Sequence, residues 1–246
     1  MNILTYGVDE RVELCAAMLG SHPSDSSIML LPIPTSRDGE HISGTGIPLT
    51  EPLREMRENM TVVGYNIPEI LRTGCAERFL DLSRDEEFLE ENARLTAEGC
   101  VGYILSTSKR VPSEQKIGIA GYGRIGRALL RYLLFFGANV RVYTSRECVR
   151  RSLAESGVES RLARYGERAD ISGLDIFINT APSPLLSEED CRAARGCRII
   201  ELASGDNIPS CASPERLMSV PARVYPKSAA RAYFNAVVRA IGGGGR

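Results

Sequence analysis

The sequence predicts an α/β protein with two parallel sheets, and three observations lead to this prediction. Short apolar runs alternate with segments of helical periodicity along nearly the whole chain, which is typical of parallel strands joined by crossover helices. A glycine-rich turn, Gly121-Tyr-Gly-Arg-Ile-Gly126, lies between an apolar run and a helical pattern. A polar stretch that contains Pro112, residues 106–116, separates the two halves. We therefore expect a smaller, flavodoxin-like α/β domain, followed by a doubly wound parallel sheet.

Four strands are predicted in the first half. Each is a short apolar run, and helical patterns lie between the runs. Thr50, with Pro52 two residues later, is typical of a helix start. A long irregular segment, residues 34–48, directly follows the second run, and loops of this length often carry functional residues. The predicted strands are residues 3–6, 28–33, 61–65 and 78–82, and the predicted helices are residues 10–19, those after Thr50, and 67–72.

Two helix starts precede the boundary between the halves. Ser83 and Glu86 have the spacing of a capping box, and a second start at Asn92 leads into an apolar helix. We expect such crossing helices to join the two domains. The predicted parts are a substrate or partner domain with a linking helix at residues 1–105, a nucleotide-binding domain at 106–228, a C-terminal helix at 229–241 and a flexible tail at 242–246.

The second half repeats the alternation of strands and helices. A helix start is predicted at Ser187, because three acidic residues follow it directly. The predicted strands are residues 117–120, 139–143, 175–180, 198–202 and 222–225, and the other predicted helices are residues 125–136 and 148–156.

The glycine-rich turn has the sequence context of a dinucleotide-binding Rossmann-type fold. It follows an apolar strand, opens a helix, and is followed by a second strand. Gly121 permits the tight turn, Gly123 leaves room for a pyrophosphate, and Gly126 permits close packing of helix on strand. A tight turn without a ligand would use the same residues. The predicted nucleotide-binding residues here are Gly121, Tyr122, Gly123, Arg124, Ile125 and Gly126.

The end of the following strand indicates which nucleotide binds. NAD-specific folds place an acid there, whereas this chain has Thr144, Ser145 and Arg146, with no acid before Glu147. Hydroxyl groups and a guanidinium suit the 2′-phosphate of NADP. The sequence therefore favours NADP over NAD, although an Arg146 that is only a solvated helix-start residue is the alternative.

Two later loops are predicted to border the nicotinamide. Both follow apolar strands, and ligands of open α/β sheets bind beyond the carboxyl ends of strands. Their small and hydroxylated residues suit the close approach of a ring and a ribose, and ordinary turns use the same residues. The predicted residues are Thr180, Ala181 and Pro182 in the first loop, and Ala203 and Ser204 in the second.

Composition excludes several classes of function. The 246 residues carry a net charge of −1, so the basic excess expected of a protein that binds nucleic acid or an anionic membrane is missing. No apolar run approaches the length of a membrane span, and the first residues lack the pattern of a secretory signal. The seven cysteines form no C-x-x-C pair, so we expect free thiols and no metal site. We expect a cytoplasmic protein.

These motifs together resemble the family of dipicolinate synthase A subunits. The resemblance covers most of the chain. It implies an NADP-dependent oxidation of a dihydrodipicolinate-type precursor to the spore metabolite dipicolinate, a homo-oligomer, and a partner in the form of a second, flavoprotein-like subunit. The motifs are Gly7-x-Asp9-x-Arg11, Leu31-Pro-Ile-Pro34 with Asp38-Gly39, Asn92 with Thr96-Ala-Glu98-Gly99, GYGRIGRAL, DIFINTAPS, IIELAS and Tyr225-Pro-Lys227-Ser-Ala.

The implied reaction needs a small dicarboxylate to be oriented against the nicotinamide, and cations and hydroxyl groups suit that task. Each of three candidates also has a structural alternative. Arg37 is equally compatible with a solvated position on the loop surface. Lys227 is equally compatible with an ion pair to Asp206, and Glu98 with a structural hydrogen bond. The predicted substrate-binding residues are Arg11, Thr35, Ser36, Arg37, Asp38 and Asn92, and the predicted catalytic residues are Lys227, Glu98 and Ser228.

The sequence has to be weighed against two rival functions. A D-2-hydroxyacid dehydrogenase uses a histidine late in the chain to protonate the carbonyl, but the only histidines here are His22 and His41. The second rival is a non-catalytic NADP(H)-binding subunit or sensor that acts through a partner protein. Relative to the family that the chain resembles, the loops on the substrate side are shortened, which is consistent with this rival.

Overall fold

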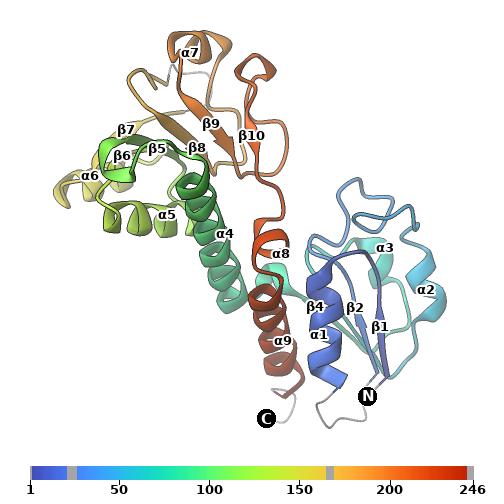
Figure 1. Cartoon of the computed structure of the whole chain (residues 1–246). Coiled ribbons are helices and arrows are strands. Elements are labelled where there is room, and N and C mark those ends of the chain that lie inside the picture. Colours follow the sequence, from blue (N-terminus) through green and yellow to red (C-terminus); the bar gives the residue numbers. More distant parts are fainter. Residues whose placement is uncertain (1, 21–26, 165–168, 243–246) are drawn as a thin grey trace. The chain divides into compact units, whose positions relative to one another are not determined.

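The computed structural model describes residues 2–20, 27–164 and 169–242, and the chain forms two compact units (Figure 1). Unit 1 contains Met1–Leu95 and Pro221–Arg246, and unit 2 contains Thr96–Val220. The sequence-based division placed the boundaries after residues 105 and 228 and kept the last helix separate, whereas in the structure this helix belongs to unit 1. The predicted tail lies outside the described residues from residue 243 onward.

The sheet of unit 1 has four parallel strands in the order β1-β2-β3-β4. They coincide with the four predicted apolar runs, and Ile28 of the second strand pairs with Ile3 and with Thr61. The strands are β1 (Asn2–Thr5), β2 (Ser27–Leu30), β3 (Met60–Gly64) and β4 (Arg78–Asp81), and the helices between them are α1 (Glu10–Gly20), α2 (Glu51–Glu55) and α3 (Glu69–Arg72).

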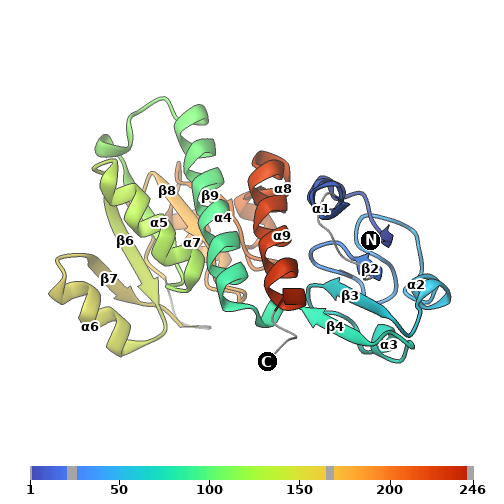
Figure 2. The same cartoon turned by 90° about the horizontal axis from the view of Figure 1, so that it is seen from below.

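The last helix, α9 (Pro226–Gly242), completes the core of unit 1 and lies beside α1 (Figures 1 and 2). Leu30 and Val63 of the sheet pack with Tyr233 of α9 in one buried cluster. The Tyr233 hydroxyl donates to the carbonyl oxygens of Leu31, at 2.9 Å, and Val63, at 3.2 Å. A second buried cluster, on the other side of the sheet, includes residues of α2 and α3. Unit 1 is therefore built from both ends of the described chain.

One long helix, α4 (Glu86–Thr107), runs through the boundary between the units. Two predictions about its start are wrong. Ser83 lies in a short 3-10 turn, η1 (Leu82–Arg84), and its hydroxyl donates to Asp81 rather than capping the helix. Asp85 caps instead, accepting a hydrogen bond from the Phe88 N–H at 2.8 Å. The helix continues through Asn92 without a second start.

Unit 2 contains a six-stranded parallel sheet in the order β10-β9-β8-β5-β6-β7. The predicted strands from residue 117 to residue 202 are all present, each within a residue or two of its expected bounds. The strands are β5 (Lys116–Ala120), β6 (Asn139–Thr144), β7 (Glu159–Leu162), β8 (Ile176–Asn179), β9 (Arg198–Glu201) and β10 (Glu215–Arg216), and the helices are α5 (Arg124–Phe135), α6 (Glu147–Glu155) and α7 (Glu188–Ala193) with the 3-10 turns η2 (Pro112–Glu114) and η3 (Ser210–Ala212). The short helix α8 (Val220–Val224) begins at the last residue of unit 2 and continues into unit 1.

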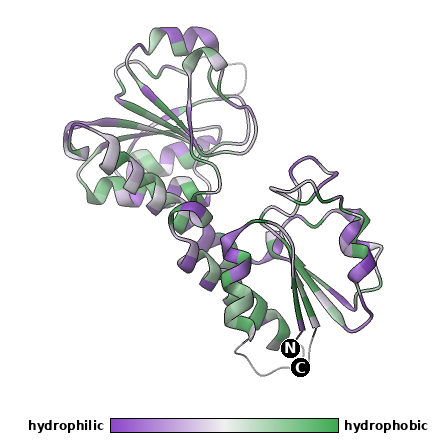
Figure 3. Ribbon diagram, turned by 45° about the vertical axis from the view of Figure 1, so that its right-hand side comes forward, coloured by the Kyte–Doolittle hydropathy of each residue, from purple (hydrophilic) through white to green (hydrophobic). Residues whose placement is uncertain are grey.

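Alternate residues of these strands point into two buried clusters, as expected of a sheet covered on both faces. Ile117 and Ile119 contact one cluster, which includes residues of α4, α5 and α6. Phe177 and Ile199 contact the other, which includes residues around α7. Hydrophobic colouring accordingly follows the strands of both sheets (Figure 3). The prediction of an α/β protein with two parallel sheets is confirmed.

Two elements near the sheet edges differ from prediction. Residues 222–225 do not form a strand, because residues 222–224 belong to α8 and Tyr225 lies between α8 and α9. Pro221 occupies the first turn of α8, where proline is well tolerated. The last strand of the sheet is β10, earlier in the chain. The edge strand β7 was not predicted, because its sequence ESRL contains a single apolar residue.

Candidate functional site

The strand order of unit 2 reverses beside β5. The chain runs outward from β5 through β6 to β7, then returns to β8 and continues outward to β10. Open α/β sheets bind ligands beyond the carboxyl ends of the strands at such a reversal. The order in the described part of unit 1 follows the chain without a reversal. The loops after β5, β6, β8 and β9 therefore define the candidate nucleotide site.

The three motif glycines occupy different environments in the loop after β5. Gly121 has φ +91°, a conformation that favours glycine. A Cβ atom on Gly126 would lie 2.1 Å from the Gly121 carbonyl oxygen, so only glycine permits this packing of helix on loop. A Cβ atom on Gly123 would meet no described atom within 4 Å. The space above Gly123 is thus open to a ligand, and these environments fit a bound pyrophosphate.

Helix α5 starts at this open position without a side-chain cap. Gly123 is its N-cap residue and offers no side chain to the N–H groups of the first turn. Free N–H groups and the helix dipole together favour an anion at such a start. Tyr122 and Ile125 are partly buried against the core of unit 2, which fixes the loop and the first turn on either side. Arg124 begins the helix itself.

The loop after β6 reaches back to the glycine loop. Thr144 is buried, and its Oγ1 accepts the Arg146 N–H at 3.3 Å, while Ser145 is exposed. Arg146 Nη2 donates to the Tyr122 carbonyl oxygen at 3.4 Å. The first acid, Glu147, is bound by Arg150 at 2.6 Å, and this hydrogen bond is the main reason that its pKa is lowered to about 2.

The loop after β8 is held against the loop after β5. The Thr180 hydroxyl donates to the Ala120 carbonyl oxygen at 2.7 Å, and a Cβ atom on Gly121 would approach this hydroxyl to 2.7 Å. Ala181 N–H donates to Asn179 Oδ1 at 3.1 Å, and the next residue, Pro182, is exposed. Two of the three predicted residues of this loop, Thr180 and Ala181, therefore lie beside the glycine turn.

A buried pair, not predicted from the sequence, joins the loops after β8 and β9. Asn179 and Glu201 are both fully buried, and Asn179 Nδ2 donates to Glu201 Oε1 at 2.9 Å. The same Oε1 accepts the Ala203 N–H at 2.9 Å, and burial raises the pKa of Glu201. Ser204, the next residue, is exposed. The available signal in the sequence was an acid, Glu201, directly after the apolar pair Ile199 and Ile200 at the end of the strand.

In unit 1, two of the predicted substrate-binding residues have partners that stabilise the fold. Arg11 is 3% exposed, and its Nη2 binds Asp9 Oδ2 at 2.6 Å and the Ile33 carbonyl oxygen at 3.0 Å. Thr35 is buried, and its Oγ1 accepts the Tyr65 N–H at 3.0 Å. These contacts join the loops after β1, β2 and β3.

The other predicted residues after β2 form a compact loop organised by Asp38. Asp38 Oδ1 accepts the N–H groups of Glu40, at 2.9 Å, and His41, at 2.8 Å, and also the Ser36 hydroxyl at 3.2 Å. The His41 N–H is the largest cause of a pKa that lies well below the usual value for aspartate. Arg37 is exposed within this loop.

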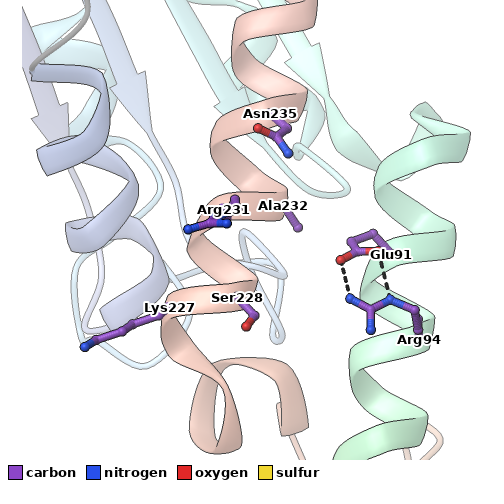
Figure 4. Close-up of a pocket in the computed structure, with 7 residues that line it drawn as sticks. All are labelled: Glu91, Arg94, Lys227, Ser228, Arg231, Ala232 and Asn235. Atoms are coloured by element: carbon purple, nitrogen blue, oxygen red, sulfur yellow. Dashed lines mark hydrogen bonds and ion pairs between the residues drawn. The ribbon is translucent and has the colours of Figure 1, made fainter.

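A cavity of about 350 Å³ in unit 1 contains two of the three predicted catalytic residues (Figure 4). Lys227 and Ser228 come from the first turn of α9, and Arg94 from α4 is bound to Glu91 at 2.6 Å. In the view shown, the side chains of Lys227 and Arg231 extend away from α4. The residues that line the cavity are Glu91, Arg94, Lys227, Ser228, Arg231, Ala232 and Asn235.

Sequence reasoning missed Arg94, Arg231 and Asn235, because helical periodicity alone does not show which faces of two distant helices meet. Asn92, also on α4, is not among the lining residues. The third predicted catalytic residue, Glu98, belongs to unit 2, where its Oε1 accepts the Tyr132 hydroxyl at 2.6 Å.

The described residues offer neither a metal-ligating cluster nor a membrane-spanning helix. No three His, Cys, Asp or Glu side chains within these residues gather in a way that could hold a metal ion. None of the helices in the described ranges is long and apolar enough to cross a membrane.

Solved structures share the fold over most or nearly all of the chain. Dipicolinate synthase A chain from Bacillus subtilis has a TM-score of 0.81 at 17% identity, over 99% of this chain and 96% of that chain. The corresponding dipicolinate synthase protein from Bacillus halodurans has a TM-score of 0.79 at 17% identity, over 98% and 97%. A transhydrogenase from Sinorhizobium meliloti has a TM-score of 0.64 at 17% identity, over 89% and 74%. The resemblance to dipicolinate synthase A subunits is thus confirmed for the fold.

No curated protein matches the chain. A family model described as "D-isomer specific 2-hydroxyacid dehydrogenase, NAD binding domain" matches residues 88–212, which are 125 of the 246 residues. The match includes the glycine loop and the strand ends that surround it. The chain therefore belongs to the D-isomer specific 2-hydroxyacid dehydrogenase family, as a nicotinamide-nucleotide-binding protein of the oxidoreductase type.

Proposed function

We propose that unit 2 binds NADP(H) and that the chain oxidises a dihydrodipicolinate-type ring to the pyridine dicarboxylate. The observation that carries this proposal is the start of α5, where an uncapped helix lies below the open space at Gly123. A pyrophosphate bound there would accept hydrogen bonds from backbone N–H groups at the point where the strand order reverses.

The preference for NADP over NAD rests on the loop after β6. Glu147 is bound by Arg150 and Arg151, so its carboxylate already has partners and is not available to the hydroxyl groups of a ribose. Arg146 reaches the glycine loop, and Ser145 is exposed beside it. A guanidinium and a hydroxyl at this position would bind a 2′-phosphate and would give NAD no comparable partner.

The cavity in unit 1 supports a small dicarboxylate as substrate. Three cationic residues, Arg94, Lys227 and Arg231, line it with a single carboxylate, Glu91. Its volume of about 350 Å³ suits a small ring compound. We assign Lys227 and Ser228 to the substrate carboxylates, where they would orient the ring.

Little acid–base catalysis is needed in this reaction. NADP+ supplies the hydride acceptor, and the ring also loses a proton, giving NADPH, H+ and the aromatic product. Because aromatisation favours the step, orientation is the main task left to the protein. Two solved structures of the same fold, both dipicolinate synthase A subunits, agree with this choice of substrate.

A non-catalytic role beside a second, flavoprotein-like subunit is the alternative, and we expect a cytoplasmic homo-oligomer in either case. The chemistry of a D-2-hydroxyacid dehydrogenase is less consistent with the chain. Unit 2 contains no histidine, because both His22 and His41 precede it in the sequence. The proton donor expected for that carbonyl reduction is therefore missing from the nucleotide-binding unit.

The test is a turnover assay combined with a binding assay. The full chain is mixed with NADP+ and freshly generated dihydrodipicolinate, and NADPH is followed by absorbance and dipicolinate by chromatography. We expect equal amounts of both products. NADPH binding without turnover would support the non-catalytic alternative, and absence of binding would refute both.

A further inference from the structure

The carboxyl group of Glu201 is an unusual component of the candidate nucleotide site. Its Oε1 accepts hydrogen bonds from Asn179 and from the Ala203 backbone, both at 2.9 Å. Its Oε2 is buried and has no hydrogen-bond partner among the described residues. A buried carboxylate with an unpartnered oxygen is costly, and such groups concentrate at functional sites.

Nearby charges do not neutralise this carboxylate. The facing residue of β8, Asn179, is a neutral amide. Arg216 of β10 attracts the negative charge of Glu201, but Asp206 in the loop after β9 repels it. These two residues bind each other at 2.8 Å, and Arg216 also donates to the Gly205 carbonyl oxygen at 3.3 Å. An ionised Glu201 therefore leaves the end of β9 with an excess negative charge.

The position of β9 in the sheet places this charge in one half of the nucleotide site. Dinucleotides lie across the reversal of strand order, with the adenosine ribose at the end of the strand that follows the glycine loop, which is β6 here. The strands on the other side of β5 are β8 and β9. Glu201 thus lies at the end of a strand in the half that would receive the nicotinamide.

We propose that Glu201 is a specificity-determining residue that makes the site favour the oxidised nicotinamide over the reduced one. The oxidised ring carries a positive charge and the reduced ring is neutral, so the ionised form of Glu201 attracts only the former. A bound cation in turn favours this ionised form and opposes the effect of burial, which raises the pKa of Glu201. This proposal rests on the proposed nucleotide binding of unit 2. It concerns which form of the cofactor binds more tightly, and it assigns no chemical step to Glu201.

The test compares the Kd of NADP+ with that of NADPH, both measured calorimetrically on the full chain. The variant Glu201→Gln keeps an oxygen for Asn179 and Ala203 and removes the charge. We expect it to shift the ratio of the two Kd values about tenfold toward NADPH, as expected for the loss of one partly screened charge interaction. The 2′-phosphate is common to both forms, so its contribution cancels in the ratio.

Glu159→Gln is the matched control, because it makes the same change at an exposed residue of the same sheet. Glu159 begins β7, which lies on the opposite side of β5 from β9. We expect the control to leave the ratio unchanged. A second variant, Arg216→Gln, changes an exposed residue. It removes the cation that attracts Glu201, leaves the buried pair of Asn179 and Glu201 intact, and should shift the ratio of the Kd values the other way, toward NADP+. This second variant keeps the proposal testable if Glu201→Gln does not fold.

The outcomes separate this proposal from the proposed function. If the wild-type chain binds neither form, nucleotide binding itself is refuted, and this inference with it. If both forms bind but folded Glu201→Gln keeps the wild-type ratio, only the role of Glu201 is refuted. The same conclusion follows if Glu201→Gln is unfolded and Arg216→Gln leaves the ratio unchanged.

Discussion

Helices α5 and α7 belong to the same sheet unit, but their first turns are built in opposite ways. At α7, the Ser187 hydroxyl accepts the Asp190 N–H at 3.1 Å, and the Asp190 carboxylate accepts the Ser187 N–H at 3.0 Å. At α5, Gly123 provides no side-chain cap. The first turn of α7 also carries three acidic residues, whereas that of α5 carries none.

This difference indicates that the start of α7 stabilises the fold, whereas the start of α5 is suited to binding a ligand. A reciprocal cap satisfies N–H groups within the protein, and acids beside it repel a phosphate. A glycine start leaves the N–H groups to be satisfied by water or by an anion. Variants at the two starts should therefore separate stability from nucleotide affinity.

The largest effect is expected for Gly126→Ala, in the glycine loop. The new Cβ atom would lie 2.1 Å from the Gly121 carbonyl oxygen, so the loop must move away from α5. We expect destabilisation of ~1–3 kcal/mol and NADPH binding weakened by up to about 100-fold. Thermal unfolding and calorimetric titration measure the two effects. Wild-type affinity would show that the loop geometry does not determine binding.

Gly123→Ala should affect binding without affecting stability. Its Cβ atom would meet no described atom within 4 Å, so the protein itself has no clash to relieve. The methyl group would occupy the space where we expect the pyrophosphate to approach. We expect an unchanged unfolding temperature and an NADPH Kd raised about tenfold, equivalent to the loss of one charge-assisted hydrogen bond. Equal affinity for the variant and the wild type would contradict the open-site interpretation.

Arg146→Ala extends the comparison to a third helix start, that of α6, where Arg146 is the N-cap residue. Loss of the guanidinium should raise the Kd of NADPH about tenfold and leave that of NADH nearly unchanged. Parallel titrations with the two nucleotides measure the difference. An equal effect on both would indicate that Arg146 only supports the glycine loop through the Tyr122 carbonyl oxygen.

The smallest effect is expected for Ser187→Ala at α7. Loss of the cap should lower the free energy of unfolding by ~1 kcal/mol. Because the α7 start satisfies its own donors, NADPH affinity should match that of the wild type. Chemical denaturation gives the first quantity and titration the second. A change in affinity would show that the two helix starts are coupled.

Local sequence patterns predicted most of this architecture, because strands buried on both faces require continuous apolar residues. The run IFIN at β8 has this form and was placed correctly, whereas ESRL at the edge strand β7 was missed. At residues 222–225, the apolar content suggested a strand, but Pro221 favours a helix start. Edges and termini carry the weakest patterns because fewer neighbours constrain them.

The candidate site was only partly predictable. The glycine loop is a local motif, so its strand, turn and helix could be read directly. The Asn179–Glu201 pair joins residues 22 positions apart, and no local period shows that these side chains meet. The cavity in unit 1 has the same limitation, because α4 and α9 are far apart in the chain. Side-chain pairs across elements depend on the tertiary arrangement.

The division of unit 1 between the two ends of the chain has a consequence during biosynthesis. All of the residues of unit 2 are synthesised before those of α9, so the chain of unit 2 is complete first. Unit 1 must wait for Tyr233, whose ring and hydroxyl complete its core. The apolar face of its early strands that packs against Tyr233 therefore stays without this helix until the end of synthesis.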